Sequence, residues 1–143
     1  MREWAAATTA TAVADFAAAL GVSTTSLVAV GAAWAALHAA WAFPMCDGYG
    51  NVVGIRLRNE RGKFAVRGSK QGIFLADVPP QKNLFVCEGP TDTAAAVELG
   101  LFAAAVAAVR RSLHGRAGVV ALLALPCGAN RLFRLGFHGF SLS

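Results

Sequence analysis

Two carboxylates follow an apolar run that the sequence predicts to be a buried strand. The run is Leu84-Phe-Val-Cys87, Glu88 comes directly after it, Gly89-Pro90 turns the chain, and Asp92 falls in the first turn of a predicted helix. Open α/β sheets place their ligand sites at the carboxyl ends of strands, which makes Glu88 a candidate site residue. A purely structural role is the alternative for Asp92, because acids at a helix N-terminus offset the macrodipole. For Glu88 that alternative is weaker, since an acid seldom follows a buried strand without a partner.

A second group of candidate residues is basic. Residues 52–58 and 63–67 indicate two strands joined by a turn. Period-two alternation puts apolar side chains on one face of this hairpin and cations on the other. The cations are Arg56, Arg58, Lys63 and Arg67, and Lys70 follows in a Gly/Ser loop. Because facing like charges repel, a surface that contacts phosphates explains the grouping better than a solvated edge, which remains the alternative.

The remaining pattern predicts the elements that must position these residues. Alanine-rich residues 2–20 and capped residues 23–30 favour an N-terminal helical part, with glycines at both stops. Residues 32–40 fit either a helix or a loop. Short strands are predicted over 41–45, 52–58, 63–67, 73–75 and 84–87, followed by a helix over 91–99. No template fits cleanly after Leu101, and the fold class predicted is α/β.

The charge of the chain is unevenly distributed. Its 143 residues are 56% apolar and 15% charged, which suits one domain and excludes two complete ones. The formal net charge of +5 first suggests an acidic partner. Residues 1–98 are neutral, however, and the whole excess lies in residues 99–143, which hold five arginines and no Asp or Glu.

Cysteine usage and the N-terminus favour a reducing compartment. The three cysteines, Cys46, Cys87 and Cys127, are widely spaced and odd in number, so neither a disulfide framework nor a zinc cluster is predicted. The first residues carry Glu3 and lack the basic region and compact apolar core of a signal peptide. The expected location is the cytoplasm.

The run from Leu27 to Cys46 is long enough to span a bilayer, so a small membrane protein is one alternative. Alanine and glycine make up nearly half of it, Pro44 interrupts it, and Asp47 follows at once. These features favour a helix that runs into a buried strand.

Three blocks of residues resemble the catalytic core of bacterial, phage and plasmid DNA primases. The blocks are Trp41-x-Phe43-Pro44-Met45-x-Asp47-x-x-Gly50-x-Val52-Val53-Gly54-Ile55-x-x-Arg58, then Gly62-Lys63 with Gly68-Ser69-x-x-Gly72-Ile73-Phe74, then Phe85-Val86-Cys87-Glu88-Gly89-x-Thr91-Asp92. In that family a basic strand meander leads into a toprim domain. The similarity covers about residues 20–102, and the order and spacing of three blocks make it more specific than a lone acidic motif.

The resemblance implies template-directed synthesis of RNA primers in DNA replication. Glu88 corresponds to the toprim glutamate, and with Asp92 it would bind Mg²⁺ or Mn²⁺ at the centre of phosphoryl transfer. Arg56, Arg58, Lys63, Arg67 and Lys70 fall where the family carries residues that hold template and nucleotide phosphates. The implied partners are single-stranded DNA, nucleoside triphosphates and a replicative helicase. The family's zinc module has no counterpart here.

One part of the toprim pattern is missing. The family places an Asp-x-Asp pair on the next strand, whereas residues 99–143 contain no carboxylate side chain. This predicts impaired catalysis and an incomplete toprim domain. Truncation or a change of reading frame would account both for the absent acids and for the lost pattern, and an arginine-rich tail that itself binds nucleic acid is the competing explanation.

The organisation expected from the sequence has four parts. They are an N-terminal helical segment (1–40), a basic β-meander (41–82), a first toprim strand and helix (83–102) and a divergent arginine-rich tail (103–143). The function expected is that of a primase-like protein. If the metal site is incomplete, the chain is expected to be an inactive fragment. A non-catalytic nucleic-acid-binding module that uses the basic hairpin is the first alternative.

Overall fold

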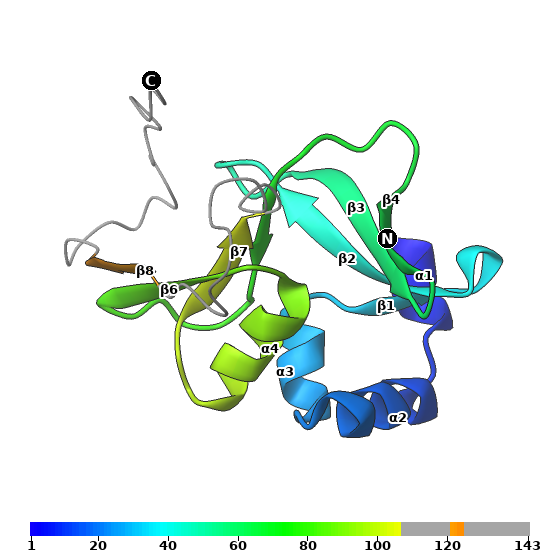
Figure 1. The fold of residues 1–143 in the computed structure, drawn as a ribbon, viewed down its shortest axis with the longest axis horizontal. Helices are drawn as coiled ribbons and strands as arrows, with labels where there is room; N and C mark the ends of the chain where they lie inside the picture. The colour runs from blue at the N-terminus through cyan, green and yellow to red at the C-terminus, as the bar shows by residue number, and fades with distance from the viewer. Residues whose placement is uncertain (107–120, 125–143) are drawn as a thin grey trace.

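The computed structural model describes residues 1–106 and 121–124 and shows helices packed against a mixed β-sheet, which confirms the predicted α/β class (Figure 1). The five arginines of the tail and Cys127 lie outside these residues, whereas residues 103–106 and 121–124 of the tail form strands. The helices are α1 (Arg2–Ala7), α2 (Ala10–Leu20), α3 (Thr24–Ala29) and α4 (Pro90–Glu98), with a 3₁₀ turn at Ala36–His38. The strands are β1 (Ala33–Ala35), β2 (Ala40–Cys46), β3 (Val52–Asn59), β4 (Gly62–Ala65), β5 (Ile73–Leu75), β6 (Asn83–Cys87), β7 (Ala103–Val106) and β8 (Ala121–Ala124).

Among the described residues the strands follow the order β4-β3-β2-β5-β7-β6-β8, and β1 also pairs with β2. The pairs from β1 to β4 are antiparallel hairpins of neighbouring segments. β6 and β7 are parallel, with α4 as the connection between them. The strand-to-helix unit predicted around Glu88 is therefore present, and β7 extends it into a βαβ unit.

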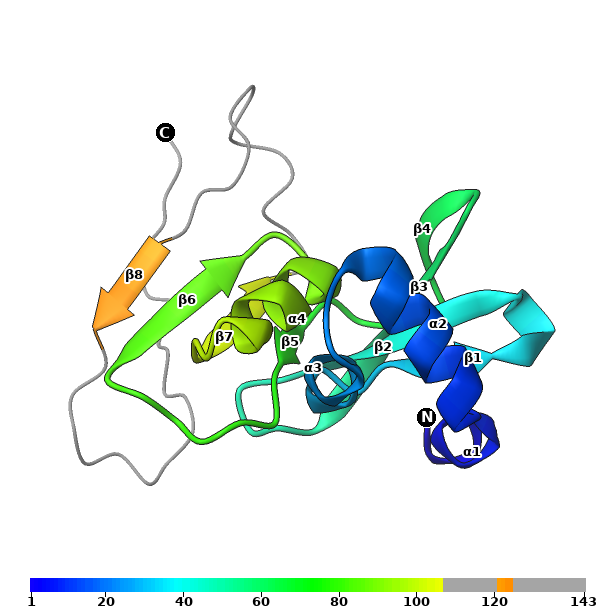
Figure 2. The same ribbon diagram turned by 90° about the horizontal axis from the view of Figure 1, so that it is seen from below.

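Three helices cover one face of this sheet. α2, α3 and α4 lie together below the sheet in Figure 1 and in front of it in Figure 2. The main core forms between them and the sheet, where Leu27 and Ala94 pack in one cluster with Phe43, Met45 and Phe74. α1 supplies Trp4 to a second cluster on the opposite face, around Ala42 and Leu57. The sheet is thus buried on both faces near β2 and β3.

The single helix predicted over residues 2–20 is wrong, because the chain forms two helices that break at Thr8 and Thr9. Thr8 has extended backbone angles, and its hydroxyl donates to the Trp4 carbonyl at 2.6 Å and accepts from the Trp34 amide at 2.8 Å. The Thr9 side chain accepts from the Ala12 amide and caps α2. Threonine side chains that bond the backbone locally compete with helix continuation.

The apolar run over residues 27–46 is divided between the end of α3 and the strands β1 and β2. Residues 32–40, predicted as helix or loop, instead supply an edge strand and a tight turn. In the part of the chain that the structure describes, no helix is both long and apolar enough to cross a membrane.

The basic hairpin is confirmed, with a shorter second strand than the predicted 63–67. β3 pairs with β4 so that Arg58 lies opposite Lys63 and Arg56 opposite Ala65. Leu57 is buried in the second cluster and Ile55 packs against it, which confirms the apolar face. β4 ends at Ala65, so Arg67 lies in the following loop rather than on the strand.

Candidate functional site

The loop between β6 and α4 turns at Gly89 and is fixed by Thr93. Gly89 is the N-cap of α4 and brings no side chain to cap it, while Pro90 occupies the first turn, where its missing N–H costs nothing. The backbone amide and the buried hydroxyl of Thr93 both donate to the Gly89 carbonyl at 3.0 Å. The start of α4 is therefore rigid and carries its partial positive charge on a first turn that no N-cap side chain covers.

Glu88 and Asp92 are both exposed at this loop, one just before and one just after the turn. A Cβ atom built on Gly89 would lie 3.7 Å from Oδ2 of Asp92, so this carboxylate faces the turn. The structure thus places the two predicted acids where the sequence expected them, at the carboxyl end of β6 and in the first turn of α4.

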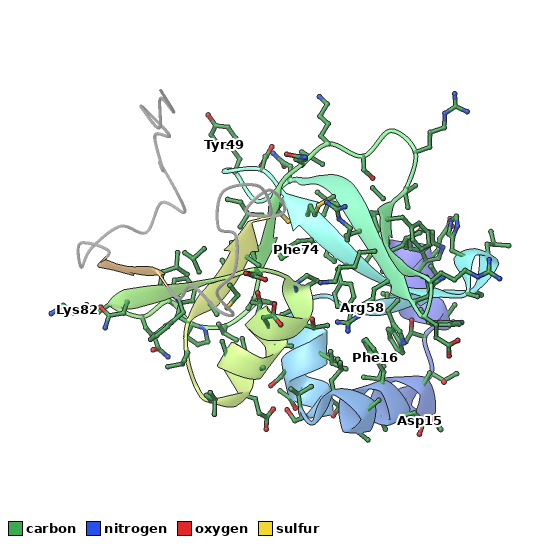
Figure 3. The ribbon with its side chains drawn as sticks, in the orientation of Figure 1. Asp15, Phe16, Tyr49, Arg58, Phe74 and Lys82 are labelled. Carbon is green, nitrogen blue, oxygen red and sulfur yellow. The ribbon has the colours of Figure 1, made fainter. Side chains whose placement is uncertain are left out.

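Arg58 reaches this loop from β3. Its Nη1 donates a 2.7 Å hydrogen bond to Oγ1 of Thr91, thirty-three residues further along the chain. The side chain is half-buried, and Figure 3 shows it between the sheet and the helices, close to the start of α4. A guanidinium has five N–H donors, so one bond to Thr91 fixes its direction while the group keeps capacity for an anion.

Lys63 reaches the same loop from β4. It is exposed, lies directly opposite Arg58 in the strand register, and its Nζ is 3.8 Å from the Cβ position of Gly89. Lys63 and Asp92 thus both lie close to Gly89. Two cations, two carboxylates and a helix N-terminus are gathered at one turn, which is an arrangement suited to a phosphate with its counter-cation.

The other three predicted cations do not converge on this turn. Arg56 is half-buried beside Phe43, on the same face as Arg58. Arg67 and Lys70 are exposed in the loop after β4, and the Lys70 amide bonds the Val53 carbonyl. Val53 is five residues before Arg58 on β3, roughly 16 Å at the usual rise. A role in binding phosphates stays a prediction for these three.

The carboxylates fit a metal that is shared with a substrate. Among residues 1–106 and 121–124, no group of three or more His, Cys, Asp or Glu side chains is arranged to hold an ion. Mg²⁺ is commonly held by one or two carboxylates together with substrate phosphates and water. Glu88 and Asp92 carry hard oxygen atoms of that kind, near the Arg58 and Lys63 side chains.

Cys87, the last residue of β6, is half-buried next to the site. Burial raises the pKa of its thiol, the Thr93 hydroxyl opposes that shift, and the nearby Asp92 charge adds to it. Because the thiolate is the reactive form, the raised pKa lowers the reactivity of this cysteine.

The far end of α4 is held by Glu98. Its Oε2 accepts from the Ser23 amide at 2.8 Å and from the Ser26 hydroxyl at 2.7 Å. Hydrogen bonds from the Ser23 and Ser26 side chains and the Ser23 amide lower the pKa of Glu98. Ser23 is also the N-cap of α3, so the start of α3 and the end of α4 are joined through one carboxylate.

Thr91 and Gly89 were not among the predicted site residues. Thr91 accepts a hydrogen bond from Arg58, which is distant in sequence. Only the three-dimensional arrangement of β3 and α4 reveals this contact. The strand that carries Trp34 was also missed, because its alanine-rich surroundings gave no sign of a strand. No protein-family model, curated protein or solved structure matches this chain.

Proposed function

We propose that this chain is a primase-like protein of the toprim type, which engages single-stranded DNA and nucleoside triphosphates at the β6–α4 turn in the cytoplasm. The single observation that supports this most is the convergence of Arg58 and Lys63 on the turn that carries Glu88 and Asp92. The primase resemblance requires a basic meander to deliver cations to an acidic strand-to-helix turn, and these side chains come from the two corresponding segments.

The roles of the residues follow from their chemistry. Arg58 is oriented by Thr91 and offers a planar set of donors to phosphate oxygens. Lys63 adds an exposed point charge close to Gly89, near the Asp92 carboxylate. Glu88 and Asp92 would hold Mg²⁺ or Mn²⁺ together with the phosphates. When bound, such an ion neutralises charge that develops on triphosphate oxygens.

A non-catalytic nucleic-acid-binding module is the second candidate. It is favoured by the carboxylate count, because residues 99–143 contain no acid to complete a toprim metal pair. In this case Arg58 and Lys63 bind backbone phosphates, and Glu88 is dispensable.

Two measurements on the full chain separate these functions. In the first, primer synthesis is assayed on single-stranded DNA with nucleoside triphosphates and Mg²⁺ or Mn²⁺, using wild type and Glu88→Gln. Primers made by wild type and abolished in Glu88→Gln support the primase proposal. Absence of primers with both metals contradicts it.

In the second, anisotropy of a labelled oligo(dT) reports binding at several salt concentrations. Each lost phosphate contact to a single strand reduces the slope of log K against log salt by about 0.7, so Arg58→Ala and Lys63→Ala should each show that change. Lys82→Ala is the matched control, because Lys82 is exposed at the far end of the molecule in Figure 3. Equal losses in all three variants would contradict phosphate binding at the turn.

A further inference from the structure

An open groove of about 820 Å³ lies between α2 and the sheet, beside Arg58. Phe16 and Leu20 of α2 form one wall, and Trp34, Trp41 and Arg58 form the other. A smaller hollow of about 350 Å³ shares Phe16, Trp34 and Trp41 with it. Aromatic rings are therefore the main feature of this surface.

The rings are held in fixed positions. Phe16 stacks on Trp41 with centroids 4.3 Å apart and planes 7° apart, and Trp41 is only 9% exposed. Trp34 contacts Trp41 edge-on, at 5.6 Å and 64°, and is itself half-buried. Its backbone amide is bound by the Thr8 hydroxyl. Trp41 is thus already covered, whereas Trp34 is anchored through its backbone and still contributes its ring to the groove.

Strand register links this aromatic pair to the basic pair. Trp34 lies opposite Trp41, Trp41 opposite Arg58, and Arg58 opposite Lys63, so the four side chains form one row across β1, β2, β3 and β4. With strands about 4.8 Å apart, the row is roughly 14 Å long. This exceeds the rise of about 3.4 Å between stacked nucleotides, so the row is long enough to contact more than one nucleotide.

The charges along the groove favour a polyanion with planar rings. Arg58 and Arg61 line it, and Lys63 continues the row toward the β6–α4 turn. Glu60 lines the groove at the β3–β4 turn, and Asp15 lines the smaller hollow. Exposed aromatic side chains beside cations are the combination by which proteins bind single-stranded nucleic acid, since bases stack and phosphates pair.

We propose that this groove binds bases of single-stranded DNA, one of which stacks on Trp34 while phosphates of the same strand contact Arg58 and Lys63. The inference rests on the proposed function, because it takes those two cations as phosphate ligands. It adds a base contact that phosphate binding alone does not require.

The test compares two ligands of equal charge on the full chain: a short labelled oligo(dT), and an abasic oligonucleotide with the same backbone. Trp34→Leu removes the ring and keeps apolar bulk. It should weaken oligo(dT) binding about tenfold, because stacking of one base on an aromatic side chain has an effect of this order, and leave abasic binding unchanged. Trp34→Phe should restore most of the affinity. Tyr49→Leu is the aromatic control, since Tyr49 is 89% exposed and lies apart from the groove in Figure 3.

Quenching of tryptophan fluorescence in the wild-type protein reports on base stacking without any substitution. Oligo(dT) should quench it and the abasic ligand should not. The stacking proposal is overturned if both ligands bind wild type equally, or if Trp34→Leu weakens both to the same degree. The proposed phosphate site fails separately, if Arg58→Ala and Lys63→Ala leave the binding of both ligands unchanged.

Discussion

Arg58 on β3 and Thr91 at the start of α4 are joined by a 2.7 Å hydrogen bond across thirty-three residues of sequence. At the other end of α4, Glu98 accepts from Ser23 and Ser26. The helix between the parallel strands is therefore held at both ends by groups from the first 58 residues. These two contacts add to the core packing of Ala94 in positioning α4 relative to the basic hairpin.

Replacing Thr91 by Val removes the hydroxyl and keeps the shape of the side chain. Arg58 then loses its hydrogen bond to the Thr91 hydroxyl. We expect the free energy of unfolding to fall by about 1 kcal/mol, because the donor is a charged guanidinium but the bond is partly open to water. Affinity for oligo(dT) should fall severalfold, since the guanidinium is no longer held toward the turn. Urea denaturation and anisotropy measure the two effects.

Thr91→Ser keeps the hydroxyl and is the matched control for this substitution. This variant should keep nearly the same free energy of unfolding and nearly the same affinity for oligo(dT) as wild type. If Val and Ser variants bind oligo(dT) equally well, the hydrogen bond does not position Arg58 for a ligand.

Gly89→Ala should change binding much more than stability. The added Cβ meets its nearest atoms, Oδ2 of Asp92 and Nζ of Lys63, at 3.7 and 3.8 Å, and the extended backbone at this position suits any residue. Alanine is a poorer N-cap than glycine by about 1 kcal/mol. It also reduces the conformational entropy of the unfolded chain, which stabilises the fold by a similar amount. The methyl group adds bulk close to both the Lys63 ammonium and the Asp92 carboxylate, so affinity for oligo(dT) should fall severalfold.

Gly54→Ala provides the contrast. A Cβ there collides with the Lys70 carbonyl oxygen and comes within 2.8 Å of the Met45 Cε. We expect a loss of about 3 kcal/mol in urea denaturation, as in an overpacked core. Equal stability losses in the two glycine variants would contradict the difference in packing between the two positions.

Thr8→Val should destabilise the N-terminal part by about 2 kcal/mol. The change removes both hydrogen bonds of the hydroxyl, and it leaves the Trp34 amide and the Trp4 carbonyl without that partner. Near-ultraviolet circular dichroism should also change, because Trp34 packs edge-on against Trp41. Thr8→Ser keeps the hydroxyl and should show neither effect, so a Ser variant as unstable as the Val variant would contradict this assignment.

Glu98 should make stability depend on pH in the acidic range. Hydrogen bonds from Ser23 and Ser26 lower its pKa in the folded state below the ordinary value of 4.5. The charged carboxylate therefore stabilises the fold above the unfolded pKa, and this contribution is lost as the pH falls through the lower, folded value.

The check is the melting temperature of wild type and Glu98→Gln across that range. Glutamine accepts the same hydrogen bonds without charge, so wild type should melt higher near neutral pH, and the difference should close below pH 4.5. A difference that stays constant with pH would exclude this role for the Glu98 charge.

Local patterns predicted much of this fold. Gly21 ends α2 with φ of +70°, Ser23 caps α3, and the strand at 73–75 begins and ends where alternation and turn residues placed it. These features depend on neighbouring residues alone, and so a single sequence contains them. The exposed positions of Glu88 and Asp92 at a strand-to-helix turn follow from the same local signals.

The sequence did not reveal what depends on distant partners. Thr8 interrupts a good helical pattern because its hydroxyl binds the amide of Trp34, twenty-six residues away. Residues 33–35 become a strand because β2 pairs with them, since alanine has no strand preference of its own. Likewise, nothing near Arg58 in the sequence indicates that its guanidinium would lie at Thr91.

The strand that carries Lys63 has a further consequence for the molecule in solution. In the described part of the sheet, β4 is the end of the strand order, so one side of its backbone has no neighbouring strand. Lysine on such an edge discourages another chain from adding a strand, because pairing would bring its charge against the incoming molecule. We therefore expect Lys63 to act against self-association as well as to face the β6–α4 turn, because without it the β4 edge would lack this charge.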